Sequence, residues 1–218
     1  MIPFNLLYKS LLNEYGFQNW WPADTIDEMI IGSILTQNVS WQNVKKAIQN
    51  LKDQDLLSFE KLHEHPINDF SLLLKPTRFY NQKAQKLLNF SCYFKEKYDF
   101  NYNRLFNNNQ TILRKELLSI NGIGKETADS ILLYAGNYNI FVIDAYTIRL
   151  LNRLGILDKN NEKYDYVQNL ITESVENNIT IYKDFHAQIV IHCNMICKSK
   201  PMCDVCILKK DCKKLFFN

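Results

Sequence analysis

Apolar residues recur along this chain at the three- and four-residue spacing of an α-helix, and few glycines or prolines interrupt them. Ile26, Ile30 and Ile34 share one helical face. Thr25 and Glu28 form a capping box at the start of that helix. The 218 residues include only 6 Gly and 5 Pro, too few for the many turns of an all-β fold. We therefore predict an all-α fold of many short helices.

The same period places the individual helices. The first is expected to end near residue 37 and the second to start after Ser40. Further helices are expected at about 57–64, 81–97, 111–120, 125–135, 145–154, 162–177 and 180–195. Residues 140–143 form a short apolar segment that can be extended, but no partner strand is evident.

Composition limits the class of protein. Hydrophobic residues make up 46% of the chain and charged residues 22%, as in an ordinary globular protein. No apolar run approaches the ~18–20 residues that span a bilayer, so we expect no membrane helix. The N-terminus has Lys9 inside its apolar stretch and does not resemble a signal peptide. A cytoplasmic protein is expected, and the net charge of +3 is compatible with an anionic partner.

Cysteines are concentrated near the C-terminus, with the spacing Cys197-x5-Cys203-x2-Cys206-x5-Cys212. Four thiolates so close in sequence can surround one metal centre, and the spacing alone leaves structural zinc and a [4Fe–4S] cluster open. Several lysines lie among them and form either a solvated face or a surface for phosphates. These are Lys198, Lys200, Lys209, Lys210, Lys213 and Lys214.

The stretch Leu118–Ala128 predicts two helices joined by a turn that contains Gly122 and Gly124. Glycines let a backbone bend sharply and come close to another molecule. The first amides of the second helix then form a seat for a phosphate oxygen. An ordinary glycine-capped helical turn is the alternative interpretation.

This turn is followed by the segment Val142–Arg149, and together they resemble the helix-hairpin-helix DNA glycosylases of the endonuclease III superfamily. The resemblance implies that the hairpin grips the DNA backbone and that Asp144 is the catalytic carboxylate. Asp144 can equally cap the helix that begins near residue 145, and the two roles are compatible. The residues that the resemblance assigns to DNA in the hairpin are Gly122, Gly124, Lys125 and Thr127.

Bifunctional members of this superfamily carry a lysine immediately before the hairpin threonine, where this chain has Glu126. The lysine amine attacks the sugar and permits strand cleavage. Lys125 is adjacent, but consecutive helical residues point ~100° apart. We therefore expect a monofunctional glycosylase without efficient lyase activity.

The resemblance also favours an iron–sulfur cluster, because proteins similar to endonuclease III carry a C-terminal four-cysteine cluster loop. It implies a [4Fe–4S] cluster held by Cys197, Cys203, Cys206 and Cys212. The first gap is five residues here and usually six in that family. Cys193 as the first ligand leaves a gap of nine, which fits less well, and we expect it in a helical core.

An aromatic set surrounds the sequence Leu35–Asn38. Flat side chains can form the walls of a pocket for an extruded base, and tryptophan faces attract a cationic alkylated purine. Tryptophans that only fill a core are the alternative. The set resembles the 3-methyladenine glycosylase branch, which implies a base pocket of Trp20, Trp21, Pro22 and Trp41.

The same branch implies two side chains that enter the DNA stack, Gln37 and Phe79. Phe79 lies in the segment 78–84, which matches a loop that probes the opposite strand. Asn81 and Lys83 of that segment are expected to contact DNA.

The resemblance, which covers Trp20 to Cys212, implies two helical domains with DNA in the groove between them. Residues 22–132 are expected to form a helical barrel with the hairpin at about 111–135. Residues 1–21 with 133–218 are expected to form the second domain. The expected activity is removal of alkylated purines such as 3-methyladenine from double-stranded DNA, by a monomer associated with the nucleoid. The alternatives are an endonuclease III-like enzyme for oxidised or mismatched pyrimidines, and a non-catalytic DNA-binding or redox-sensing module.

Overall fold

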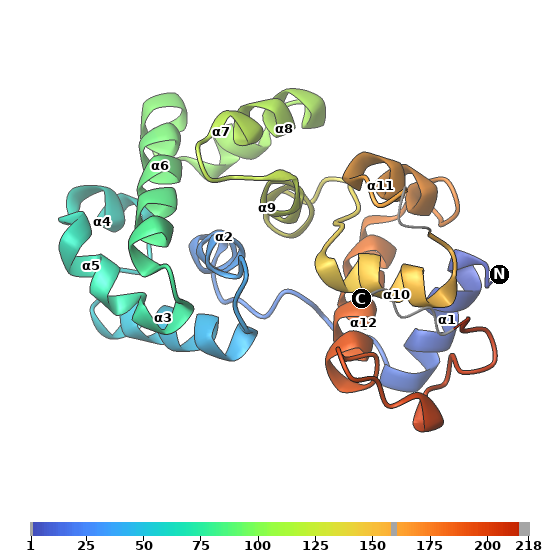
Figure 1. Cartoon of the computed structure of the whole chain (residues 1–218). Helices are drawn as coiled ribbons and strands as arrows, with labels where there is room; N and C mark the ends of the chain where they lie inside the picture. Colours follow the sequence, from blue (N-terminus) through green and yellow to red (C-terminus); the bar gives the residue numbers. More distant parts are fainter. Residues whose placement is uncertain (1, 158–160, 214–218) are drawn as a thin grey trace. The chain divides into compact units, whose positions relative to one another are not determined.

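The computed structural model describes residues 2–157 and 161–213, and within them the chain is helical without any strand (Figure 1). This confirms the predicted all-α class. The chain divides into two compact units. We call Pro22–Gly136 the central unit, and the residues up to Trp21 together with those from Asn137 onward the terminal unit. The sequence places the second boundary after residue 132, and the contacts place it after Gly136. In the described part of the chain, no helix has the length and apolar character needed to cross a membrane.

The central unit contains eight α-helices and two short turns of other helix types among its described residues. These are α2 (Ile26–Leu35), α3 (Trp41–Asp53), α4 (Phe59–Glu64), α5 (Ile67–Leu73), η1 (Lys75–Thr77), α6 (Tyr80–Tyr98), α7 (Tyr102–Phe106), α8 (Gln110–Ser119), α9 (Lys125–Ser130) and η2 (Ile131–Ala135). η1 is a 3-10 turn, and η2 is a π-helical turn that directly continues α9.

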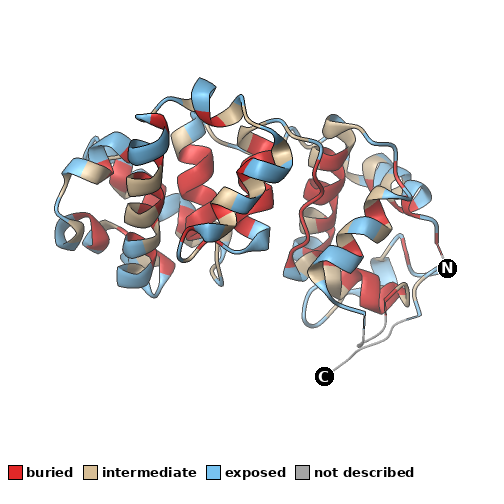
Figure 2. Ribbon diagram, turned by 90° about the horizontal axis from the view of Figure 1, so that it is seen from above, coloured by how far each residue is buried: buried red, intermediate tan, exposed pale blue. Residues whose placement is uncertain are grey.

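α2 is the core helix of the central unit. It contacts α3, α6, α9 and η2, and most of its length is buried (Figures 1 and 2). Ile30, Ile31 and Ile34 are fully buried, and each contributes about 1.5–3 kcal/mol relative to an exposed side chain. The predicted capping box is partly formed. Thr25 Oγ1 accepts from the Glu28 amide at 3.1 Å, whereas Glu28 reaches the amide of Asp24 rather than that of Thr25.

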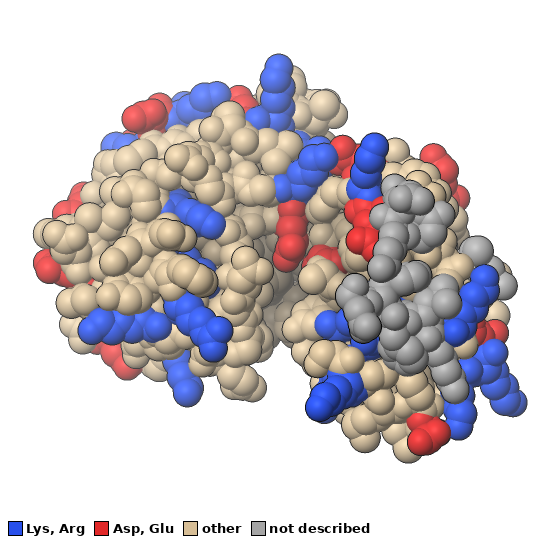
Figure 3. All heavy atoms as spheres, in the orientation of Figure 1, with Lys and Arg blue, Asp and Glu red and all other residues tan. Residues whose placement is uncertain are grey.

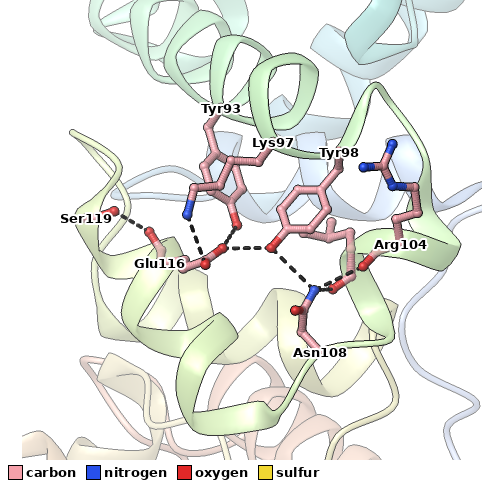
Figure 4. Close-up of polar contacts among 8 residues, drawn as sticks. Tyr93, Lys97, Tyr98, Arg104, Asn108, Glu116 and Ser119 are labelled. Carbon is pink, nitrogen blue, oxygen red and sulfur yellow. Dashed lines mark hydrogen bonds and ion pairs between the residues drawn. The ribbon is translucent and has the colours of Figure 1, made fainter.

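Glu116 joins α8 to the end of α6 (Figure 4). Its Oε2 accepts hydrogen bonds from the hydroxyls of Tyr93 and Tyr98 at 2.9 and 2.7 Å. Its Oε1 lies 2.9 Å from Lys97 Nζ. Burial opposes ionisation of Glu116, but the bonds from Lys97, Tyr98 and Tyr93 outweigh it and lower the pKa of the carboxyl. An ionised Glu116 therefore stabilises the folded central unit.

Replacing Glu116 by Gln is expected to lower the free energy of unfolding at pH 7 by about 1–3 kcal/mol, because the tyrosine hydrogen bonds then go to a neutral acceptor and the ion pair with Lys97 is lost. A lowered folded-state pKa stabilises the protein above the unfolded pKa, and that contribution is lost as the pH falls through the folded pKa. The difference between variant and wild type should therefore shrink from pH 7 to pH 4. Urea unfolding followed by circular dichroism at both values measures it.

Glu96→Gln is the matched control, because Glu96 is an exposed carboxylate on α6, the helix whose side chains contact Glu116. It should change the free energy of unfolding by less than about 0.5 kcal/mol at either pH. A Glu116→Gln variant that is as stable as wild type at pH 7, or equally destabilised at both values, would refute the role of this ionised carboxylate.

The terminal unit packs around α12. Its described elements are α1 (Phe4–Tyr15), α10 (Ala145–Leu154), α11 (Tyr164–Thr172), α12 (Ile179–Met195) and η3 (Cys203–Val205). α12 contacts both α1 and α10. Asp184 of α12 accepts from the Tyr8 hydroxyl at 3.0 Å and from the Gln18 amide at 2.8 Å. α12 therefore holds the N-terminal helix and the segment that leads to Trp20.

Several expected boundaries differ from the structure. The sequence analysis missed α5 and α7, which are seven and five residues long. α11 ends at Thr172 rather than near residue 177, because Asn178 already caps α12 by accepting from the amide of Thr180 at 2.9 Å. Residues 140–143 are buried and form neither helix nor strand. Side chains of α11 satisfy part of this backbone, with Gln168 Nε2 donating to the Phe141 carbonyl at 2.6 Å.

Candidate functional site

The predicted hairpin is present between α8 and α9. Gly122 has φ +95°, a left-handed conformation that strongly favours glycine, and an added Cβ would meet the side chain of Lys86. Gly124 precedes α9 and has open space where a Cβ would lie. The backbone at Gly124 is therefore accessible to a molecule that approaches closely. Lys125 is exposed beside it.

Gln37 is folded against this hairpin. Its Nε2 donates to the Gly122 carbonyl at 3.2 Å and to Thr127 Oγ1 at 3.1 Å, and its Oε1 accepts from Lys86 Nζ. Thr127 is buried, with 5% of its surface exposed. Its hydroxyl therefore faces Gln37 inside the fold, which differs from the expectation that this side chain contacts DNA. The insertion of Gln37 into DNA stays a prediction, and it requires that these bonds open.

The segment before α6 exposes Phe79, with 66% of its surface accessible. Arg78 and Phe79 both have left-handed backbone conformations, with φ of +55° and +42°. Asn81 is exposed on the first turn of α6. Phe79 and Asn81 are thus accessible, as DNA contacts require.

Lys83, which was expected to contact DNA, is buried. Only 3% of its surface is exposed, and its Nζ donates to the carbonyls of Leu35 and Thr77 at 2.8 and 2.7 Å. Burial, with a smaller contribution from Lys86, lowers the pKa of Lys83 to about 8. The ammonium group has no access to a phosphate, so the expected direct contact with DNA is wrong.

Asp144 follows the buried segment 140–143 and caps α10. Its Oδ1 accepts from the amide and from Oγ1 of Thr147, both at 2.7 Å. Its Oδ2 lies 3.6 Å from Nε2 of His186, which is beyond hydrogen-bond length. Only 9% of Asp144 is exposed.

Asp144 is nevertheless ionised. Burial raises its pKa, but His186 and the two bonds from Thr147 outweigh burial and hold the pKa below its usual value. The helix N-terminus also favours the negative charge. The helix cap predicted from the sequence is therefore present. The carboxylate of Asp144 is a fixed anion, and both bonds from Thr147 go to its Oδ1 rather than to its Oδ2.

The four tryptophan-region residues divide between the units. Trp20 and Trp21 end the N-terminal segment of the terminal unit, with ring centroids 5.6 Å apart in an edge-on arrangement. Pro22 and Trp41 belong to the central unit, where Trp41 is the first residue of α3. Each tryptophan is partly exposed. A common base pocket of these four residues stays a prediction.

The four cysteines of the predicted loop line one cavity. Cys197, Cys203, Cys206 and Cys212 surround it together with apolar side chains that include Leu150, Pro201 and Leu208. Cys193 is not among the lining residues, is 1% exposed and lies in α12. This supports its placement as a helical core residue.

The spacing of these thiols bears on the kind of metal centre. In the described part of the chain, no three His, Cys, Asp or Glu side chains converge tightly enough to hold a single metal ion. A tetrahedral zinc site requires sulfur atoms roughly 3.8 Å apart, from its Zn–S bonds of about 2.3 Å. In a [4Fe–4S] cluster each thiolate binds a different iron and the sulfurs lie further apart. Four cysteine thiols around one cavity are the donor set that a [4Fe–4S] cluster takes. Which metal centre they hold stays a prediction.

Two arginines of α10 fix the start of this loop. Arg149 Nε and Arg153 Nη1 each donate to the Cys197 carbonyl at 3.0 Å. Arg153 Nη1 is also 3.2 Å from Cys197 Sγ. A hydrogen bond from Cys193, together with Arg153, lowers the pKa of the Cys197 thiol to about 6. A thiolate at this position suits metal ligation.

The lysines of this loop are exposed through Lys213, whereas Lys214 lies outside the described residues. Lys209 forms a 3.3 Å ion pair with Asp204. Both signs of charge occur on the surface of each unit (Figure 3). The lysines are therefore available to an anionic partner, although they form part of a mixed surface.

The glycine hairpin and the capped aspartate, carried by two helical units, are together the features that the sequence analysis associates with helix-hairpin-helix DNA glycosylases. The family described as "HhH-GPD superfamily base excision DNA repair protein" matches residues 31–177. The chain belongs to this superfamily, which confirms the family resemblance of its motifs.

The most informative relatives are of two kinds. MJ1434 of Methanocaldococcus jannaschii, described provisionally as a DNA repair glycosylase, is 46% identical over 207 residues, which cover 94% of each chain. Endonuclease III of Thermotoga maritima is 26% identical over 188 residues, 85% of this chain and 81% of that protein.

Solved structures share the fold. The 3-methyladenine DNA glycosylase MagIII of H. pylori, bound to 1,N6-ethenoadenine, has a TM-score of 0.77 and 27% identity over 88% of this chain and 97% of that one. An endonuclease III–DNA complex has a TM-score of 0.83 over 98% of this chain and 97% of that one. Its 16% identity shows a common fold alone.

Sequence reasoning missed three residues that shape these sites, which are His186, Lys86 and Arg153. His186 lies close to Asp184 and Gln188 in a helix that is rich in apolar residues, and this group of polar residues is a signal that could have been noticed. Lys86 and Arg153 have ordinary sequence surroundings. Their contacts depend on tertiary packing and leave no local signal.

Proposed function

We propose that the protein is a monofunctional DNA glycosylase that hydrolyses the N-glycosidic bond of alkylated purines, such as 3-methyladenine, in double-stranded DNA. The carrying observation is the ionised Asp144, fixed at the N-terminus of α10 in a chain of the base excision repair superfamily. We further propose that it acts as a monomer in the cytoplasm, on nucleoid DNA.

Asp144 supplies the chemistry of the proposed reaction. Loss of the base develops positive charge on the deoxyribose, and a fixed carboxylate stabilises that charge. The same carboxylate can accept the proton of the attacking water. Because Thr147 engages Oδ1, Oδ2 is the oxygen available for the substrate. His186, 3.6 Å from Oδ2, lies beside that oxygen.

The choice of alkylated purines rests on the tryptophans and on one relative. A methylated purine that carries positive charge is attracted to aromatic faces, and it is already a good leaving group. Trp20 and Trp21 offer such faces next to each other. The similarity to MagIII, a 3-methyladenine DNA glycosylase, supports the same substrate class.

The absence of efficient lyase activity rests on Glu126. This residue is exposed in the first turn of α9, at the position where the bifunctional enzymes carry the attacking lysine. A carboxylate cannot form a Schiff base with the sugar. Borohydride should therefore trap little covalent enzyme–DNA adduct.

Cys197, Cys203, Cys206 and Cys212 are the residues that we propose hold a [4Fe–4S] cluster. The cluster would cross-link the loop, and the exposed lysines of the loop, such as Lys198 and Lys210, would then face DNA phosphates.

A panel of duplexes tests the proposed function. Each duplex carries one lesion, which is 3-methyladenine, 7-methylguanine, 1,N6-ethenoadenine, thymine glycol or a G·T mismatch. Alkylated purines are expected to be released at least about tenfold faster than the pyrimidines. Alkali should be required to cleave the strand at the resulting abasic site.

The other outcomes decide between the alternatives. Release of thymine glycol or mismatched thymine alone would assign the endonuclease III-like function. Binding to duplex DNA without release of any base would assign a non-catalytic module. Strand cleavage without alkali would refute the monofunctional assignment.

A further inference from the structure

Lys83 is a buried cation at the start of α6, and it joins two elements that are distant in sequence. Its Nζ donates to the carbonyl of Leu35, the last residue of α2, and to that of Thr77, the last residue of η1. A carbonyl at a helix C-terminus lacks a helical partner and attracts a cation. The ammonium group therefore links the ends of α2 and η1.

Each carbonyl that Lys83 binds belongs to a residue two positions before one of the two side chains expected to enter the DNA. Gln37 lies two residues after Leu35, and Phe79 lies two residues after Thr77. Both loops contain left-handed backbone at non-glycine residues, with φ of +54° at Asn38 and +42° at Phe79. Such conformations persist only where the surroundings fix them. Lys83 provides a fixed point immediately before each loop.

Lys86 extends this arrangement by one turn. It lies three residues after Lys83 and hence on a neighbouring part of the same helical face. Its Nζ donates to the side chain of Gln37, and its methylene chain packs against Gly122 of the hairpin. One face of α6 therefore contacts the Gln37 loop twice, through the backbone before it and through the side chain itself.

Hydrogen bonding, rather than space filling, is the specific contribution of Lys83. A methionine would occupy a similar volume without the desolvation that an ammonium group incurs. What only the lysine provides is the pair of bonds of 2.8 and 2.7 Å. We infer that Lys83 is a positioning residue that sets the separation of the Gln37 and Phe79 loops, so that both side chains can enter the duplex around an extruded base. This inference rests on the proposed glycosylase function.

Lys83→Met tests the inference through two matched substrates. One duplex carries the alkylated purine opposite its normal partner base, and the other carries it opposite an abasic site, where no partner needs to be displaced. On the paired lesion, single-turnover base release should fall at least about tenfold. On the lesion without a partner base it should remain within about threefold of wild type. Affinity for undamaged duplex should change less than about threefold.

Lys95→Met is the control, because Lys95 is exposed on the same helix and pairs with Asp99 away from both loops. It should leave both rates unchanged. Equal loss on the two substrates would show a merely structural role for Lys83 and would overturn the inference. Unchanged rates on both would also overturn it.

A second measurement uses wild-type protein and so avoids a variant that fails to fold. The lowered pKa of Lys83 means that its charge is lost as the pH rises through about 8. The neutral amine keeps two N–H donors, but its hydrogen bonds to the two carbonyls are weaker than those of the ammonium group. Lys86 is the charged neighbour that acts on it, α2 and η1 present carbonyls, and Lys75 and Arg78 on either side of Thr77 are exposed. The ratio of the two rates, unpaired to paired, should rise between pH 7 and pH 9. A constant ratio would contradict the inference.

Failure of the proposed function is distinguishable from failure of this inference. A wild-type protein that releases no base from any lesion refutes the function. Insertion can then be measured alone, by the fluorescence of 2-aminopurine opposite an abasic-site analogue in the bound duplex. Lys83→Met should reduce the fluorescence gain that wild type produces, and an equal gain in both proteins would overturn the positioning role.

Discussion

Replacing Asp144 by Asn is expected to abolish base release, with a decrease of at least about 10³-fold in the single-turnover rate. Electrostatic stabilisation and proton transfer each contribute about 10²-fold or more in enzymes of this kind. Asparagine caps helices as well as aspartate does, so the bond from the Thr147 amide can be kept. The variant should therefore remain folded and should bind DNA that contains an abasic site within about threefold of wild type.

Asp165→Asn is the matched control, because Asp165 is an exposed carboxylate in the same unit, on α11. It should leave the rate unchanged. The lowered pKa of Asp144 also predicts that this group does not limit the rate between pH 5 and 8, since it stays ionised there. An Asp144→Asn variant that keeps more than about a tenth of wild-type activity would remove the proposed mechanism.

Replacing Cys197 by Ala is expected to remove most of the bound iron and the absorbance near 400 nm that marks a [4Fe–4S] cluster. The cavity lined by the four cysteines would lose one ligand of the proposed cluster, and the loop would lose the cross-link that the cluster provides. DNA affinity should fall at least about tenfold, because the lysines of the loop are no longer held in place. Elemental analysis of protein purified without oxygen, together with DNA titration, measures both effects.

Cys193→Ala is the informative comparison. Cys193 is buried in α12 outside the cavity, so this variant should keep its iron and its affinity for DNA. Loss of iron in Cys193→Ala but not in Cys197→Ala would show that the ligand set begins at Cys193. A colourless protein that contains zinc would refute the cluster for all four cysteines.

Local sequence signals were sufficient to predict most of the helices and the N-terminal caps of α2 and α10. Thr25 before α2 and Asp144 before α10 are capping residues followed by apolar residues at helical spacing. The short helices α5 and α7 each span fewer than two turns, so too few apolar residues repeat at helical spacing for the pattern to be recognised. The end of α11 depends on the competing cap at Asn178, which periodicity alone does not show.

Burial and long-range pairing account for what the sequence could not predict at the sites. The sequence segment that exposes Phe79 buries Lys83 four residues later, and no pattern in 78–84 distinguishes the two outcomes. His186 reaches Asp144 only because α12 packs on α10. Gln37 was expected to point toward DNA, but the structure turns its amide onto the hairpin. Each case depends on tertiary contacts rather than on residue type.

We propose that this protein hydrolytically removes alkylated purines through Asp144. Chromatographic identification of the free bases that wild type and Asp144→Asn release from methylated duplex DNA measures this activity. Wild type should release 3-methyladenine as the intact base and leave abasic sites, and the variant should release none above the spontaneous rate. Equal release by both proteins would refute the role of Asp144, and no release of methylated purines by wild type would refute the proposed activity.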